Sequence, residues 1–481
     1  MEKPIIVERN VDHALFQFIF PFSIKSGVQD DFKAQLKQDG YKMFFLDDLP
    51  CEDAYYGEGY QVSHRNMERF YLPFTGNILF PHTEDPEAFQ RFSRSIEIDC
   101  ILASRHNKIP FCLLSADVVI CPFNLGFITV RVRLDEPSLT YTEALEFANR
   151  FRVLQDVSLP DDLTSVIYDN KKYKEIEDFI FKVVVASTLP FFDTTGMEGA
   201  YFETMPFFVD ERMYVQAFYS FEDQLPISEI EQYRGARIDG LDYKGQPFIS
   251  STNPEYITSF VATHSYTRWG PDTYYVMDEN SFNCMTNLKG SKMKNLANQM
   301  YGEYYYGLLL NLFHKIVLLK LSNNYSKVRY DRNGDDIEEL IGQITRFSSK
   351  YFFTELATQS QAKEILGQLR RIFGNNSFYE DVKKTLADLY KYQADITDRR
   401  TSYMVMIFTV FTVISGIYGM NQVIEDLKGP IDWSVLRSYS LFQYVALVVT
   451  IVGLIIGIML GIRMLFQTIK SWKKKLRKDV F

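Results

Sequence analysis

The sequence has few cysteines and histidines, and they form no pattern that would hold a metal ion or a disulfide framework. The 481 residues include five cysteines without a CxxC pair and six histidines without an HExxH motif. This cysteine usage favours a reduced, cytosolic setting, and it assigns no metal ligands. The chain also lacks a GxSxG elbow, a GxxxxGK[ST] loop and a GxGxxG turn. We therefore predict that the protein is not an enzyme; the alternative is a membrane-anchored enzyme whose catalytic set comes from distant residues.

An excess of positive charge is also absent. The chain has 52 lysines and arginines against 61 acidic residues, a net charge of −9, which excludes a generally basic nucleic-acid-binding protein. The charge is unevenly distributed along the chain. The first 400 residues have a net charge of −14, whereas the tail from Arg463 has seven basic residues and one acid. An acidic main part is thus followed by a basic end.

Two long uncharged segments are present near the C-terminus. Residues 401–424 and 438–462 contain no charged side chain, and each is longer than the about 20 residues that a helix needs to cross a bilayer. Two buried core helices are the alternative, although soluble helices of this length generally have a polar face. Basic residues flank the pair, and the loop 425–437 between them has a net charge of −1. The positive-inside rule then predicts a multi-pass protein of the plasma (inner) membrane with both termini cytoplasmic.

These features predict six parts of the chain. In order they are a cytosolic α/β domain (1–285), long helices and a stalk (286–400), a first, pore-lining transmembrane helix (401–424), an outer loop (425–437), a second transmembrane helix (438–465) and a basic cytosolic tail (466–481). Alternating apolar residues predict strands near 13–20, 96–100, 127–134, 205–221 and 256–278. Helices are expected near 141–155, 171–187, 291–326, 336–373 and, after a capping-box pattern, 378–418.

The first uncharged segment has a stripe of small and hydroxylated residues on one helix face. At spacings of three and four its members are Ser402, Val405, Thr409, Thr412, Gly416 and Gly419. Such stripes let helices approach closely. Two explanations remain open. Either the stripe serves packing alone, with the hydroxyls bonded to their own backbone, or it lines a water-filled pore, which requires an oligomer because two helices cannot enclose one.

The segment ends with Ile417-Tyr418-Gly419-Met420-Asn421, which resembles the signature of the CorA family of divalent-cation channels. In that family Tyr-Gly-Met-Asn ends the first of two C-terminal helices, and a short loop, a second helix and a basic tail follow. The resemblance covers roughly residues 377–481. It implies a funnel-shaped homopentamer, with an α/β N-terminal cytosolic domain, long helices and two C-terminal transmembrane helices.

The resemblance also implies a function, the passage of divalent cations down their electrochemical gradient, with Mg²⁺ as the expected ion. It implies an ion-selectivity site at Gly419, Met420 and Asn421 and a pore lined by Thr409, Thr412 and Gly416. A neutral polar ring suits hydrated Mg²⁺, which loses its water reluctantly. Acids in the outer loop would attract cations, with an ordinary solvated loop as the alternative, and lysines would form an inner basic ring. These residues are Glu425, Asp426 and Asp432 in the loop and Lys470, Lys473, Lys474 and Lys475 in the tail.

The large N-terminal part leaves two alternatives for control. In the CorA family, acids at subunit contacts bind regulatory Mg²⁺, and Asp335, Asp336, Glu338 and Glu339 are candidates, although acids are common in any first helical turn. Some enlarged CorA-like proteins instead accompany type III CRISPR antiviral defence, in which a nucleotide-type second messenger acts on the cytosolic domain. The turn 289–294 is then a candidate phosphate site, with a solvated basic turn as the alternative. The expected partners are the membrane, further copies in a pentamer, divalent cations and, in the second case, a nucleotide-type ligand, but no nucleic acid.

Overall fold

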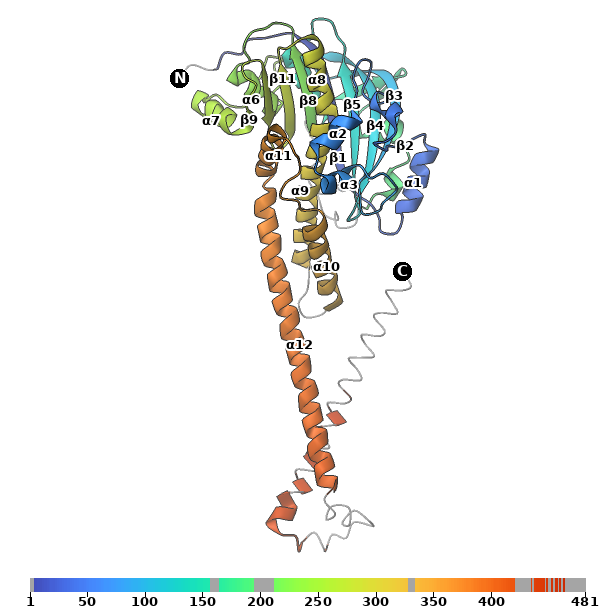
Figure 1. Ribbon diagram of the computed structural model, residues 1–481, viewed down its shortest axis with the longest axis vertical. Helices are drawn as coiled ribbons and strands as arrows, with labels where there is room; N and C mark the ends of the chain where they lie inside the picture. Colours follow the sequence, from blue (N-terminus) through green and yellow to red (C-terminus); the bar gives the residue numbers. More distant parts are fainter. Residues whose placement is uncertain are drawn as a thin grey trace. The chain divides into compact units, whose positions relative to one another are not determined.

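The computed structural model describes residues 4–155, 164–193, 212–327 and 334–419, with short pieces between 434 and 462 (Figure 1). The chain divides into two compact units, of which the first consists of residues 1–327 and 342–383 and the second of residues 328–341 and 384–481. The sheet and its covering helices belong to the first unit.

The first unit is built on one mixed sheet of eleven strands. Their order is β7-β6-β3-β4-β5-β1-β8-β11-β10-β9, and β2 pairs with β3 outside this path. Neighbouring strands are antiparallel except β8 and β11, which are parallel. The strands are β1 (Val11–Ser23), β2 (Lys42–Met43), β3 (Gln90–Ala103), β4 (Lys108–Cys121), β5 (Leu125–Leu134), β6 (Ser165–Tyr168), β7 (Lys171–Tyr173), β8 (Tyr214–Phe221), β9 (Ser265–Tyr266), β10 (Thr273–Met277) and β11 (Ser281–Thr286).

Helices cover the sheet and continue beyond it. In Figure 1, α8 and α9 cross one face of the sheet, α6 and α7 lie near β9–β11, and α1 lies near β2. The helices are α1 (Gln29–Gln38), η1 (Leu49–Glu52), α2 (His64–Phe70), α3 (Pro73–Leu79), α4 (Tyr141–Phe151), α5 (Ile176–Phe179), η3 (Ile180–Val184), η4 (Leu189–Phe191), α6 (Glu229–Arg237), α7 (Pro254–His264), α8 (Gly290–Tyr301), α9 (Glu303–Lys327), α10 (Gly334–Lys350), α11 (Ser360–Ile372) and α12 (Asn375–Gly419).

One face of the sheet packs through aromatic side chains. Every second residue of β1 from Phe16 is a buried phenylalanine, because successive side chains of a strand point to opposite faces. Phe16 and Phe18 contact Phe147 and Phe151 of α4, with ring centroids 4.7–6.1 Å apart. The Thr140 side chain and Glu143 form a capping box that begins α4 at this position. The apolar face of β1 therefore fixes where α4 lies.

The opposite face carries a buried polar row beneath α8 and α9. Gln17 donates to Gln216 (3.0 Å) and to the carbonyl of Met300 (3.1 Å), so β1 and β8 are both bonded to the end of α8. Arg131 donates to Gln17 (2.9 Å) and forms an ion pair with Asp117 (2.7 Å). A buried polar group is tolerated only when it is bonded, so these contacts hold the helices in one register over the sheet.

The structure corrects the expected fold class. A mixed α/β unit is present, but the CorA-like arrangement with two C-terminal transmembrane helices is not found, and in the part of the chain that the structure describes no helix is long and apolar enough to cross a membrane. The first expected span is only the end of α12, a 45-residue helix whose earlier turns are rich in charge. Only part of the second expected span, 438–462, is described, and its described residues from 441 onward are helical.

The predictions that depended on those spans are corrected by the same finding. The first is the description of the chain as a membrane protein with transmembrane helices that transports ions. The second is the membrane and the membrane-embedded pentamer as partners. The third is the multi-pass localisation in the plasma (inner) membrane with cytoplasmic termini. Each required two spanning helices, which the described residues do not provide.

Candidate functional site

The residues of the expected ion pathway are only partly described. Gly419 is the last residue of α12, whereas Met420, Asn421, the three loop acids and the four tail lysines lie outside the described residues. The hydroxyls of Thr409 and Thr412 donate to the carbonyls of Val405 and Phe408, both at 2.8 Å. Gly416 is exposed, and a Cβ placed on it would meet no atom within 4 Å.

The candidate ligand-holding groups in the first unit are already engaged or scattered. Lys289, in the turn considered for a phosphate, forms an ion pair with Asp12 and donates to the carbonyl of Phe221. Among the described residues, no group of three or more histidine, cysteine or acidic side chains is placed to hold a metal ion. We therefore build no phosphate site at Lys289 and no metal site on the described residues.

The buried polar row includes three charged side chains, and Arg91 belongs to it together with Asp117 and Arg131. Burial raises the pKa of Asp117, but the charges of Arg131 and Arg91 outweigh it and hold the pKa below its usual value. Arg91 also donates to the hydroxyls of Tyr56 and Tyr306, each at 3.1 Å. These groups are fully enclosed and satisfy one another, so the cluster joins α9 to the sheet rather than offering a binding surface.

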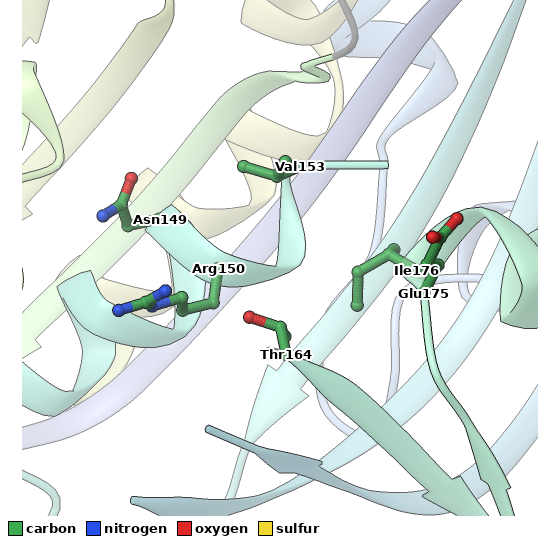
Figure 2. Close-up of a pocket in the computed structure, with 6 residues that line it drawn as sticks. All are labelled: Asn149, Arg150, Val153, Thr164, Glu175 and Ile176. Carbon is green, nitrogen blue, oxygen red and sulfur yellow. The ribbon is translucent and has the colours of Figure 1, made fainter. Parts of the chain in front are cut away.

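A small hollow of about 80 Å³ lies where α4 ends and α5 begins. Figure 2 shows its lining side chains, which are Asn149 and Arg150 of α4, Val153 after it, Thr164 before β6, and Glu175 and Ile176 at the start of α5. Arg150 forms an ion pair with Glu146 at 2.8 Å. Residues 156–163, which lie between Val153 and Thr164 in the sequence, are outside the described residues, and we build no site on this hollow.

A larger hollow of about 210 Å³ lies at α2 and α3, and we call it the α2–α3 hollow. Its lining residues are Leu46, Glu68, Tyr71, Leu72, Pro73, Gly76, Asn77, Phe80 and His82. The mixture of apolar and aromatic walls with a few polar groups is typical of small-molecule sites, although the volume is below the roughly 300–1,000 Å³ of sites for drug-sized ligands. A small ligand is therefore the class that it can take.

The aromatic wall of the α2–α3 hollow is attached to the start of α9. The hydroxyl of Tyr71 donates to the carbonyl of Glu303, and a Cβ placed on Gly307 would lie 3.1 Å from that hydroxyl. Burial raises the pKa of Tyr71 well above its usual value, so the hydroxyl keeps its proton and acts as a donor. Burial also raises the pKa of Glu303 to about 7, and the bond from its own backbone NH offsets this only in part.

The other wall is attached to the segment between α10 and α11, residues 351–359. The amide of Leu72 donates to the carbonyl of Leu356 (3.1 Å), and the amide of Thr358 donates to the carbonyl of Phe70 (2.9 Å). The ring of Phe353 lies 5.0 Å from that of Phe74 in α3. The hollow and this segment therefore share backbone and side-chain contacts along several residues.

The same segment holds the start of α12. Phe352 stacks on Tyr379 with ring centroids 3.9 Å apart and planes at 12°. The guanidinium carbon of Arg370, near the end of α11, lies 4.3 Å from the centre of the Phe352 ring. His314 of α9 donates from Nε2 to the carbonyl of Tyr351 (2.8 Å), and burial lowers its pKa to about 3, so the ring is neutral near pH 7. Segment 351–359 thus contacts α9, α11 and α12.

Comparison with known proteins assigns no family: no family model, curated protein or solved structure matches the chain. The α2–α3 hollow was not predicted from the sequence, because its lining residues follow no known motif. The high content of tyrosine and phenylalanine was the only sequence signal, and it does not distinguish a ligand wall from a packed core.

Proposed function

We propose that the first unit is a regulatory ligand-binding domain that acts on α12. A small molecule in the α2–α3 hollow would shift the wall at Leu72 and with it Phe74 of α3, and segment 351–359 would pass that shift to Tyr379. A ligand changes a conformational equilibrium only through contacts that differ between two states. The proposal therefore requires that the hollow and the start of α12 adopt at least two coupled arrangements.

The observation that carries this proposal is the double attachment of one short segment. Leu356 is bonded to Leu72, which lines the hollow, and Thr358 is bonded to Phe70 at the end of α2. Phe352, only a few residues earlier, stacks on Tyr379 of α12. Only a few residues separate the two contacts, and each residue spans at most about 3.3–3.6 Å, so the two contacts cannot move far apart. Movement at one end is therefore expected at the other.

A tethered group in the hollow tests the proposal without a known ligand. Asn77 lines the hollow, and the Asn77→Cys variant places a thiol there. A methanethiosulfonate reagent then attaches a propyl group to this thiol. The expected result is a changed rate of amide hydrogen exchange at residues 375–383. The control is Asn66→Cys, an exposed position of the neighbouring helix α2 that does not line the hollow, whereas Asn77 belongs to α3. The unsubstituted protein, whose five cysteines are buried or half-buried, gives the background labelling.

Equal exchange in labelled and unlabelled Asn77→Cys protein would contradict the proposal. An equal change in the Asn66→Cys protein would also contradict it, because the effect would then come from attaching a label to this surface and not from filling the hollow. Measurement of label occupancy by mass spectrometry ensures that an unchanged rate is not due to unreacted thiol.

We propose separately that residues 419–421 bind hydrated Mg²⁺, as the resemblance to the CorA family implies. The supporting observation is that α12 continues without interruption to Gly419, directly before Met420 and Asn421. Loss of Mg²⁺ binding in Asn421→Ala, measured by calorimetry and with Gln422→Ala as the neighbouring control, is the expected result. Equal Mg²⁺ binding by both variants and the unsubstituted protein would contradict this second proposal.

A further inference from the structure

The α2–α3 hollow has an uneven distribution of charge. Among the described residues that line it are one carboxylate, Glu68, and one histidine, His82, but no lysine or arginine. His82 is bonded through Nδ1 to Asp47 at 2.9 Å, which places a second carboxylate beside the rim. The electrostatic potential of this rim therefore favours a cation and disfavours a phosphate or carboxylate.

The walls of the hollow favour the same charge. The rings of Tyr71 and Phe80 lie 5.8 Å apart at 62°, and both line the hollow with the apolar side chains of Leu46 and Pro73. Aromatic faces attract ammonium groups, and the attraction increases where water is excluded. The amide of Asn77 offers a further oxygen acceptor to an N–H donor.

We propose that the α2–α3 hollow binds a small organic cation, in which a primary amine is attached to an apolar or aromatic body. This proposal about the ligand rests on the proposed regulatory function of the first unit. Glu68 accepts a charge-assisted hydrogen bond from the ammonium group, and Tyr71 and Phe80 contact the body of the ligand. A nucleotide-type messenger, which is strongly anionic, does not suit this hollow.

Glu68 lies on α2 and is exposed. Arg65 lies three residues earlier on α2, a spacing that permits an ion pair on a helix. In the part of the chain that the structure describes, however, Arg65 is not among the arginines that form ion pairs. The Glu68 carboxylate is therefore available to a ligand.

The test uses three probes with one body and different charges: phenethylamine, 2-phenylethanol and phenylacetate. Each is titrated into the full-length protein by calorimetry. The expected order of affinity is amine, then alcohol, with the acid weakest. Glu68→Gln is expected to weaken amine binding about tenfold and to leave alcohol binding unchanged, because a charge-assisted bond becomes a neutral one. Glu58→Gln is the matched control, since Glu58 is exposed and does not line the hollow.

The outcomes separate the ligand class from the proposed function. If the alcohol or the acid binds at least as tightly as the amine, or if Glu68→Gln and Glu58→Gln behave alike, the cationic class is overturned while the hollow remains a ligand site. If none of the three probes binds, the cationic class is overturned, and the label experiment on Asn77→Cys decides the regulatory function separately.

Discussion

Tyr379 of α12 stacks on Phe352, with ring centroids 3.9 Å apart and planes at 12°. Phe352 precedes the residues that pair with α2 and α3, so this stack joins the first turns of α12 to the segment attached to the α2–α3 hollow. The arrangement makes Tyr379 the residue at which a change in the hollow reaches the long helix.

The stacking contact predicts a modest and specific loss of stability. Tyr379→Ala is expected to lower the free energy of unfolding of the first unit by roughly 1–2 kcal/mol, since an aromatic pair contributes about 0.5–1.5 kcal/mol beyond its buried area. Tyr379→Phe keeps the ring and is expected to stay within about 0.5 kcal/mol of the unsubstituted protein. Urea unfolding followed by tryptophan fluorescence measures both. Equal losses in the two variants would show that the hydroxyl, not the stack, holds α12.

The buried polar row predicts a much larger effect. Asp117→Asn is expected to cost about 3–5 kcal/mol, because it leaves Arg91 and Arg131 enclosed without a counter-charge. The matched control is Asp135→Asn, which breaks a half-exposed pair with Arg133 and is expected to cost at most about 1 kcal/mol. Chemical unfolding of the two variants provides the comparison. A cost for Asp117→Asn as small as that of the control would mean that the row does not hold α9 on the sheet.

Glu303 predicts a dependence of stability on pH. Its pKa is about 7 in the folded protein, against an ordinary value of 4.5, because burial disfavours the charged carboxylate. The folded state therefore binds more protons than the unfolded state between these two values, and stability falls as the pH rises from about 4.5 to 7. The loss from this group is on the order of 3 kcal/mol. Glu303→Gln, which stays neutral, is expected to flatten this part of the pH profile, and an unchanged profile would contradict the assignment.

Two glycines are expected to respond oppositely to alanine. A Cβ on Gly240 would lie 2.6 Å from the backbone Cα of Glu146, which cannot move aside without displacing α4, so Gly240→Ala is expected to destabilise the protein. A Cβ on Gly367, inside α11, would meet no atom within 4 Å. Gly367→Ala is therefore expected to raise stability by about 0.5–1 kcal/mol through helix propensity. Thermal unfolding of both variants checks the sign, and a destabilised Gly367→Ala would contradict the open space around α11.

The parts of the fold that local sequence patterns specify were predicted correctly. The strands expected near 13–20 and 127–134 are β1 and β5, because apolar residues recur at every second position of both segments. The helix expected over 378–418 is confirmed as α12. The strand expected near 256–278 was correct only in its second part, which contains β9 and β10. Its first part is α7, because Asn253 caps this helix and Pro254 begins it.

Long-range contacts account for the rest. The single helix expected over 336–373 is interrupted at segment 351–359, where backbone groups bond to α2 and α3 instead of continuing the helix. The hollow depends on similar distant contacts, such as that of Tyr71 with Glu303, 232 residues later in the chain. Residue spacing along the sequence contains no information about such pairs, so neither the interruption nor the hollow could be predicted from it.

The most direct test of the account is hydrogen exchange at residues 375–383 in labelled and unlabelled Asn77→Cys protein, repeated with Phe353→Ala added. The account predicts that filling the hollow changes the exchange rate and that Phe353→Ala, which removes the contact with Phe74, abolishes most of that change. The same exchange rate in labelled and unlabelled protein would contradict the central claim that the hollow and α12 are coupled. A response of full size in the Phe353→Ala background would contradict the proposed route through segment 351–359.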